Sequence, residues 1–243
     1  MKLALLDFGE IATTDAAGVR RRVPVPGALI VTDDGSHVLV DTGMPARYIG
    51  NGDPIPNKAD CMTAVMEERH TVRHQLSLIG LRAEDISYVI ATHFDWDHAG
   101  ANADFPGATF YVQRTHLEAA RADPVRFWPE LWDVPGLNYE VVDGDAEPIP
   151  GIQVLETGGH VPGHQSVMVR MPQTGLVILA IDAIKSQHQL DDGAWETLAF
   201  AQARRSGERL ATLAREAGNS SLLIFGHDAD QWAALRHAPE WYE

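Results

Sequence analysis

The sequence lacks the features that would place it in a membrane, on nucleic acid or in a disulfide-rich class. It contains a single cysteine, Cys61, so no disulfide can form within the chain. No apolar run approaches the roughly 18 residues of a membrane span, and Asp7 interrupts the N-terminal run too early for a signal peptide. Only 19 lysines and arginines accompany 34 acidic residues, and the net charge of −15 argues against nucleic acid and membrane surfaces as partners. We therefore expect a cytoplasmic protein.

The remaining composition is that of an ordinary globular chain, with 45% hydrophobic residues among 243. Short β-prone runs alternate with helical stretches, and no linker divides them, which predicts one domain over 1–243. Asp33 to Gly35 is a hairpin turn signal. We expect strands at 2–8, 28–32, 37–41, 86–91, 108–113, 152–156, 166–171, 176–181 and 221–225, and helices at 60–79 (which includes Cys61), 115–121, 196–217 and 228–236.

The segment directly after the expected strand at 86–91 is the most informative in the chain. Four groups able to bind a metal lie there within six residues: His93, Asp95, Asp97 and His98. Imidazole and carboxylate both bind first-row divalent ions, and two subsets that face different ways can hold two ions. A solvated acidic loop, the alternative, would need neither two histidines nor the interleaved Phe94 and Trp96. The segment therefore predicts a metal site.

Three further groups follow apolar strands in the same way. His160 lies in a Gly/Pro-rich turn, Asp182 ends the most apolar run, and His227 follows the expected strand at 221–225. A buried carboxylate is costly unless it is paired, and a metal ion would pair it. Each group alone is more often structural, but their recurrence at several strand ends favours one convergent site.

These motifs resemble the metallo-β-lactamase superfamily, and more closely its N-acyl homoserine lactonase branch. The phrases that carry the closer resemblance are LVDTGMP (39–45), VQRT (112–115), LNYE (137–140), GHQS (163–166), IDA (181–183) and FGHD (225–228). The resemblance implies an α/β fold, a four-layer αββα sandwich. It also implies a hydrolase with two divalent ions, bridged by a hydroxide that opens the ring of an N-acyl homoserine lactone or a related lactone.

The resemblance also implies a role for each residue of the site. One ion would be held by His93, Asp95 and His160, the other by Asp97, His98 and His227, and Asp182 would bridge both. Asp182 or Asp97 would pass a proton to the leaving alkoxide. Asp41 would orient a ligand histidine, and His164 would support the site without binding metal.

The chain departs from the family pattern at two positions. Asp95 stands where the family usually has histidine. We expect the two ions to be Zn²⁺, with Mn²⁺ or Fe²⁺ as the alternative because carboxylate is a harder ligand than imidazole. Lys185 occupies the place of a tyrosine that stabilises the oxyanion. It would supply a cationic donor and offset the charge of Asp95; the alternative is a solvated surface lysine.

The pocket and the remaining histidines are less well defined. Met44, Phe94, Trp96 and the loop Phe127–Trp132 are candidates for a hydrophobic wall around the substrate, or for ordinary packing. His70 and His74 are expected on a charged helix face. No partner is identifiable for His37, His116, His188 and His237. A glyoxalase II-like thioesterase, another ester hydrolase, a β-lactamase and a di-iron redox protein stay open as alternatives, and the chain would be a monomer or homodimer.

Overall fold

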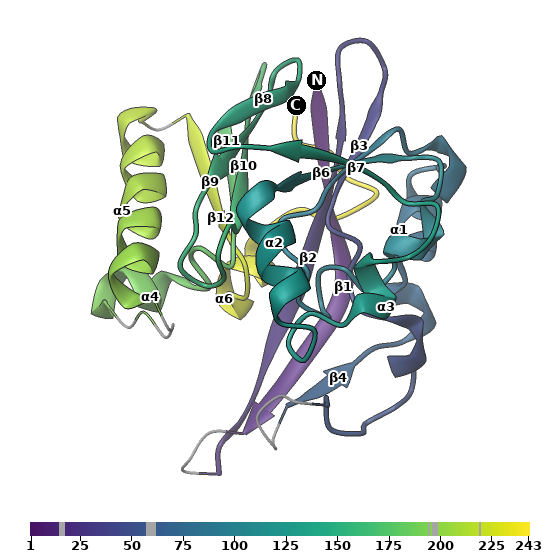
Figure 1. The fold of residues 1–243 in the computed structure, drawn as a ribbon. Coiled ribbons are helices and arrows are strands. Elements are labelled where there is room, and N and C mark those ends of the chain that lie inside the picture. The colour runs from purple at the N-terminus through teal and green to yellow at the C-terminus, as the bar shows by residue number, and fades with distance from the viewer. Residues whose placement is uncertain (15–17, 57–61, 194, 196–198, 219) are drawn as a thin grey trace.

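Two β-sheets packed face to face, with helices on both outer faces, make up the computed structural model (Figure 1). It describes residues 1–14, 18–56, 62–193, 195, 199–218 and 220–243. The first sheet has the strand order β4-β1-β2-β3-β5-β6-β7, and the second β12-β11-β10-β9-β8. The strands of the first sheet are β1 (Lys2–Thr14), β2 (Arg20–Val31), β3 (His37–Val40), β4 (Thr63–Val65), β5 (Tyr88–Ile90), β6 (Thr109–Gln113) and β7 (Asn138–Val142). Those of the second are β8 (Ala146–Ile149), β9 (Ile152–Glu156), β10 (Gln165–Met171), β11 (Gly175–Ile181) and β12 (Ser221–Phe225).

The helices are distributed over the two outer faces. They are α1 (Val72–Leu78), α2 (Arg114–Ala122), α3 (Pro129–Trp132), α4 (Gln187–Asp192), α5 (Phe200–Glu216) and α6 (Ala229–Ala234). In Figure 1, α1 and α3 lie on the side of the first sheet away from the second, whereas α5 lies beyond the second sheet. Buried side chains of α2 pack into the same cluster as those of α1 and α3. The expected αββα sandwich is confirmed. In the described part of the chain, no helix is long and apolar enough to cross a membrane.

Strand β1 illustrates why the molecule needs four layers. Successive side chains of a strand point to opposite faces of its sheet. Leu3 and Leu5 pack into the cluster between the two sheets, whereas Leu6 and Phe8 pack into the cluster beneath the outer helices. Both faces of the sheet are thus apolar, and each needs a covering layer to exclude water.

All nine expected strands are present, and so is the hairpin between β2 and β3. The expected helix at 60–79 is wrong. Within it, Thr63–Val65 forms β4 by pairing with Glu10 to Ala12 of β1, and only α1 is helical, capped by Thr71. Edge pairing with a distant strand outweighs local helix propensity in this stretch. Cys61 lies outside the described residues.

Candidate metal centre

The predicted metal-binding residues gather at one end of the sandwich, where several strands end. The segment with His93 to His98 follows β5, His160 lies in the turn between β9 and β10, Asp182 follows β11, and His227 follows β12. Strand β5 is parallel to β3 and β6, and β11 is parallel to β12, so within each sheet these strand ends share one edge.

Six of these residues form two groups suited to metal ions. The ligand atoms of each group lie within 4.8 Å of one another. One group consists of His93, His160 and Asp182; the other consists of Asp97, His98 and His227. Three protein ligands with nitrogen and oxygen donor atoms are the usual number at a catalytic divalent metal site. The structure therefore brings together six of the seven predicted ligands in two adjoining sets.

The Asp182 carboxylate lies between the two groups. Its Oδ1 atom is 3.2 Å from Nε2 of both His98 and His227, and its Oδ2 atom is 3.3 Å from Nε2 of His160. Burial acts to raise the pKa of Asp182, but the three neighbouring histidines hold it well below its usual range. The carboxylate is therefore ionised and faces both groups, as a bridging ligand must.

Three buried atoms at the centre of the cluster make no hydrogen bond, although they lie close to other ligand atoms, and they are suited to bound cations. Nε2 of His93, Nε2 of His98 and Oδ1 of Asp182 are buried without a hydrogen bond from any described residue. Buried polar atoms are normally satisfied, and leaving them unpaired costs about 1–3 kcal/mol each. Imidazole nitrogens and a carboxylate oxygen converging in this way are the donors that divalent ions use. The residues therefore fit the metal ions that the resemblance implies.

In three of the histidines, Nε2 faces the site and Nδ1 is held by a neighbouring group. Nδ1 of His98 lies 2.8 Å from Asp41 Oδ2, and Nδ1 of His227 lies 2.7 Å from the carbonyl oxygen of Pro24. Nδ1 of His93 lies 3.0 Å from the Thr92 hydroxyl. Such partners set the tautomer and aim Nε2 at the site.

Asp41 joins the loop after β3 to the metal-binding segment. Its carboxylate accepts hydrogen bonds from the backbone and the hydroxyl of Thr92, at 2.8 and 2.7 Å. Its φ of 58° is unusual for a residue with a side chain.

The loop after β3 also touches the segment at Gly100. Gly100 donates to the Gly43 carbonyl at 2.7 Å, and a Cβ at Gly100 would lie 2.2 Å from the Pro45 nitrogen. The two loops touch too closely to admit a side chain there.

Replacing Asp41 by asparagine is expected to weaken metal binding by about 10- to 100-fold, the usual effect of removing a carboxylate behind a ligand histidine. The measurement is a competition titration of the metal-free protein against a chromophoric chelator. Asp34→Asn, at an exposed turn of the same hairpin, is the matched control and should bind metal like the wild type. Equal affinities in the two variants would mean that Asp41 does not orient His98.

Asp95 lies at the site, but outside both groups of three. Its Oδ2 atom is 3.1 Å from His160 Nε2 and 3.6 Å from His93 Nε2. Arg126 binds the same carboxylate in a fork, with Nε donating to Oδ1 at 3.1 Å and Nη2 donating to Oδ2 at 2.7 Å. Nothing in the sequence indicates Arg126, because it lies in the irregular stretch between α2 and α3 and belongs to no motif.

Lys185 approaches a different carboxylate from the one expected. Its ammonium nitrogen is 3.7 Å from Asp182 Oδ2, and its side chain is 40% exposed. Arg126 forms an ion pair with Asp95, and the expectation that Lys185 offsets the charge of Asp95 stays a prediction. Lys185 stays at the edge of the site as a candidate donor.

Two buried histidines support the site from behind. Nε2 of His164 accepts a hydrogen bond from the backbone nitrogen of Asp182 at 3.2 Å, in agreement with a supporting role. His116, for which the sequence showed no partner, accepts from the Phe94 backbone at 2.8 Å, and its Nδ1 lies 2.9 Å from the Pro162 carbonyl. His116 thus ties the metal-binding segment to the turn that carries His160.

His70 is also buried, so the expected charged outer face is wrong for this histidine.

His116 is expected to make stability fall in mild acid. Burial lowers its pKa to about 4 in the folded protein, against an ordinary value of 6.5. The unfolded chain therefore binds the proton first, and stability present above pH 6.5 is lost as the pH falls toward 4. Between pH 7 and pH 5 this amounts to about 2 kcal/mol. Urea unfolding of the metal-free protein should show about that much less pH dependence in His116→Gln. An unchanged difference would contradict the assignment.

The candidate aromatic wall is packed inside the protein. Phe94 stacks on Trp132 with ring centres 5.1 Å apart, and Trp96 meets Tyr48 edge-on at 5.4 Å. The side chains of Met44, Phe127, Trp128 and Leu131 are buried in the same cluster beneath α1 to α3. Ordinary packing, the alternative to a substrate wall, describes these side chains.

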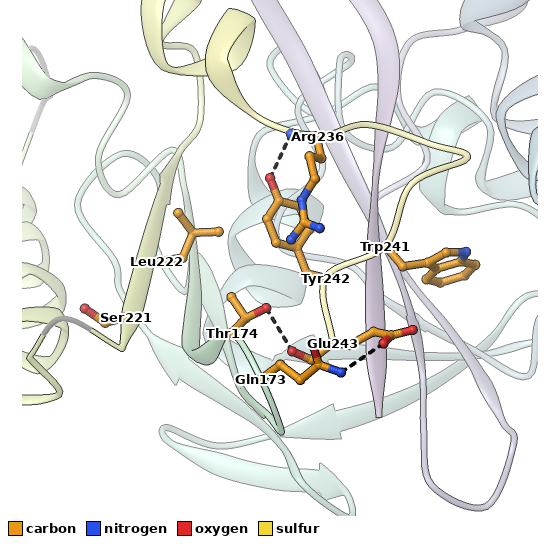
Figure 2. A pocket seen from close by; sticks show the side chains of 8 residues that line it. All are labelled: Gln173, Thr174, Ser221, Leu222, Arg236, Trp241, Tyr242 and Glu243. Atoms are coloured by element: carbon orange, nitrogen blue, oxygen red, sulfur yellow. Dashed lines mark hydrogen bonds between the residues drawn. The ribbon is translucent and has the colours of Figure 1, made fainter.

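Two surface cavities differ in their relation to the metal groups. A cavity of about 770 Å³ is lined by His227 together with residues of β2, α4 and α6, so it adjoins the second metal group. Another, of about 480 Å³, surrounds the C-terminal residues (Figure 2). There Thr174 donates to the Glu243 backbone at 2.9 Å, and Gln173 donates to the Glu243 side chain at 3.2 Å. None of the metal-binding groups lines this second cavity.

Comparison with known proteins places this arrangement in a family. The metallo-β-lactamase superfamily model matches residues 22–232. The chain is 32% identical to an N-acyl homoserine lactonase of Bacillus cereus, over 98% of this chain and 94% of the relative. It is 31% identical to a homologous lactonase of Azorhizobium caulinodans, over 93% and 90% of the two chains.

Solved structures agree with the sequence relatives. An N-acyl homoserine lactone hydrolase with the product N-hexanoyl-L-homoserine bound at its catalytic metal centre superposes with a TM-score of 0.89. The identity is 30%, and the match covers 99% of this chain and 98% of that one. A Bacillus thuringiensis variant with N-decanoyl-L-homoserine in its active site gives the same TM-score at 31% identity, over 99% and 98%. The protein belongs to the metallo-β-lactamase superfamily and, within it, groups with the N-acyl homoserine lactonases.

Proposed function

We propose that this protein is a dinuclear metal-dependent hydrolase that opens the ring of N-acyl homoserine lactones or closely related lactones. The observation that carries the proposal is the Asp182 carboxylate, whose two oxygens face two separate ligand groups. Full-length relatives act on lactones, and two solved relatives hold acyl homoserines at the corresponding centre. The cavity beside His227 offers space for a small molecule.

The ligand set follows from the two groups. His93, His160 and Asp95 would hold the first ion, with the Asp95 Oδ2 atom facing both histidines. Asp97, His98 and His227 would hold the second, and Asp182 would bind both. When bound, such ions polarise an ester carbonyl and lower the pKa of water toward neutrality. We propose Zn²⁺ as the native ion. Mn²⁺ or Fe²⁺ is the alternative, because Asp95 adds a hard oxygen ligand that suits these ions better than imidazole does.

The side chains around the ions would handle the proton and the developing charge. Asp182 and Asp97 are buried carboxylates held ionised by their histidine neighbours, and either could carry a proton to the leaving alkoxide. Lys185, beside Asp182, would donate to the oxyanion of the opening ring. No protein nucleophile is required.

Lys185→Met is expected to lower kcat for lactone opening by about tenfold and leave KM nearly unchanged. A buried oxyanion donor contributes about 100-fold or more, and the partial exposure of Lys185 reduces that figure. Steady-state kinetics at pH 7 measure the effect, and metal content is determined in parallel. Turnover equal to that of the wild type would refute a catalytic role and leave Lys185 a surface residue.

The proposal is tested by elemental analysis of protein purified without added metal, together with a pH-stat panel of lactones, thioesters and β-lactams. About two ions per chain and acid release from acyl homoserine lactones would support it. Faster acid release from the thioesters would point to a glyoxalase II-like enzyme instead. Iron with a redox-active spectrum and no acid release would point to a di-iron protein.

A further inference from the structure

The metal centre contains one more carboxylate, that of Asp95, than the two ligand groups include. Asp95, Asp97 and Asp182 are all buried and all contact its histidines. Buried carboxylates are tolerated only when they are paired. Two divalent ions would carry four positive charges. A cationic side chain at this centre is attracted by the same carboxylates as the ions, so it alters how strongly these carboxylates hold them. Arg126 and Lys185 each bring such a cation to these carboxylates, Arg126 to Asp95 and Lys185 to Asp182.

Arg126 is built into the fold at this position. Its backbone nitrogen donates to the Asp123 side chain at 3.1 Å, directly after α2, and its guanidinium lies 5.3 Å from the Phe127 ring. The Arg126 side chain is 28% exposed, so it reaches Asp95 from the rim of the site. It also carries a fixed positive charge, because arginine does not lose its proton in proteins. The Arg126 guanidinium therefore presents a permanent positive charge at a defined place beside Asp95.

The fork places the guanidinium on the oxygen that faces the first ligand group. Asp95 Oδ2 receives the shorter bond, 2.7 Å from Arg126 Nη2, and the same oxygen lies 3.1 Å from His160 Nε2. Arg126 Nη2 is itself 3.3 Å from His160 Nε2. The guanidinium and an ion held by the first group would therefore share one carboxylate. Each positive charge weakens the hold of Asp95 on the other.

We propose that Arg126 is a positioning residue that neutralises Asp95 and so sets the affinity and the metal selectivity of the first ligand group. With Arg126 in place, Asp95 adds no net negative charge to the centre, and the ions retain more power to polarise a carbonyl. Without Arg126, the Asp95 carboxylate would bind the ion more strongly and favour oxygen-preferring Mn²⁺ over Zn²⁺. The inference rests on the proposed metal centre and is independent of which substrate is hydrolysed.

The test measures metal binding by the metal-free protein, titrated with Zn²⁺ and Mn²⁺ against a chromophoric chelator. Arg126→Met should bind the first-group ion at least about tenfold more tightly, since one nearby positive charge is gone. The ratio of Mn²⁺ to Zn²⁺ affinity should rise. Arg126→Gln, which keeps a hydrogen-bond donor, should behave in the same way if the charge is what matters. Turnover should fall while binding tightens, a combination that misfolding does not produce.

A matched control and a charge-balanced variant complete the design. Arg114 forms the same fork with Asp143 at the surface, at 2.8 and 3.0 Å, so Arg114→Met should leave metal binding unchanged. Asp95→Asn should weaken binding, because the Arg126 charge then faces the ion unneutralised. The double variant Asp95→Asn/Arg126→Met should recover affinity close to that of the wild type, as a double-mutant cycle reveals coupled charges.

Dissociation constants of Arg126→Met and Arg126→Gln that stay within twofold of the wild type, or that increase, would overturn the inference. So would a wild type that binds no metal, which would also remove the proposed function. A wild type that binds two ions but opens no lactone would remove the proposed function alone, because none of these titrations uses a lactone.

Discussion

Asp182→Asn is expected to lower kcat/KM for lactone opening by about 1000-fold and to reduce bound metal below two ions per chain. The amide removes the negative charge that faces both ligand groups, and its nitrogen cannot bind a cation. Loss of metal-based charge stabilisation amounts to several kcal/mol, and about 4 kcal/mol corresponds to that rate factor. Steady-state kinetics and elemental analysis of the same sample measure both effects.

A carboxylate away from the site provides the control for this variant. Asp192→Asn, at the exposed end of α4, should retain full activity and full metal content. If Asp182→Asn retained two tightly bound ions and more than a tenth of its activity, a bridging role for this carboxylate would be untenable. The proposed dinuclear centre would then lose its main support.

Phe94→Ala is expected to reduce the free energy of unfolding by about 3–5 kcal/mol, the usual effect of removing a buried aromatic ring. Phe94 has no exposed surface, lies flat against Trp132, and also touches His116 and Tyr139. Its neighbours His93 and Asp95 belong to the metal centre, so the cavity would also loosen that segment. Urea unfolding of the metal-free protein at pH 7 measures the change.

A smaller substitution at Phe94 separates packing from a role in substrate binding. Phe94→Leu fills most of the space and should destabilise the fold clearly less than Phe94→Ala. A loss below about 1 kcal/mol for Phe94→Ala would mean that the ring faces open space. In that case the candidate substrate wall, and not core packing, would describe this side chain.

The sequence by itself predicted nine of the twelve strands in the described residues, without β4, β7 and β8, and it predicted the candidate metal ligands. Period-two alternation and short apolar runs identify buried strands, and a buried polar residue after such a run needs a partner, which is either a structural neighbour or a metal ion. His93, Asp97, His98, His160, Asp182 and His227 all meet that description, and the structure groups them. Local pattern and residue chemistry predict such a site because the candidate ligands recur at several strand ends, although each of them alone is more often structural.

Only the tertiary structure decided which distant side chains serve these ligands. Arg126 meets Asp95 across 31 positions of the chain, His116 meets Phe94 across 22, and Pro24 meets His227 across 203. Strand β4 forms where a helix was expected because β1 offers it an edge. The loop Phe127–Trp132 packs into the core instead of lining a pocket, because the fold buries its side chains in the cluster beneath α1 to α3. Each outcome depends on which surfaces the fold brings together, and no local propensity or spacing encodes contacts at such separations.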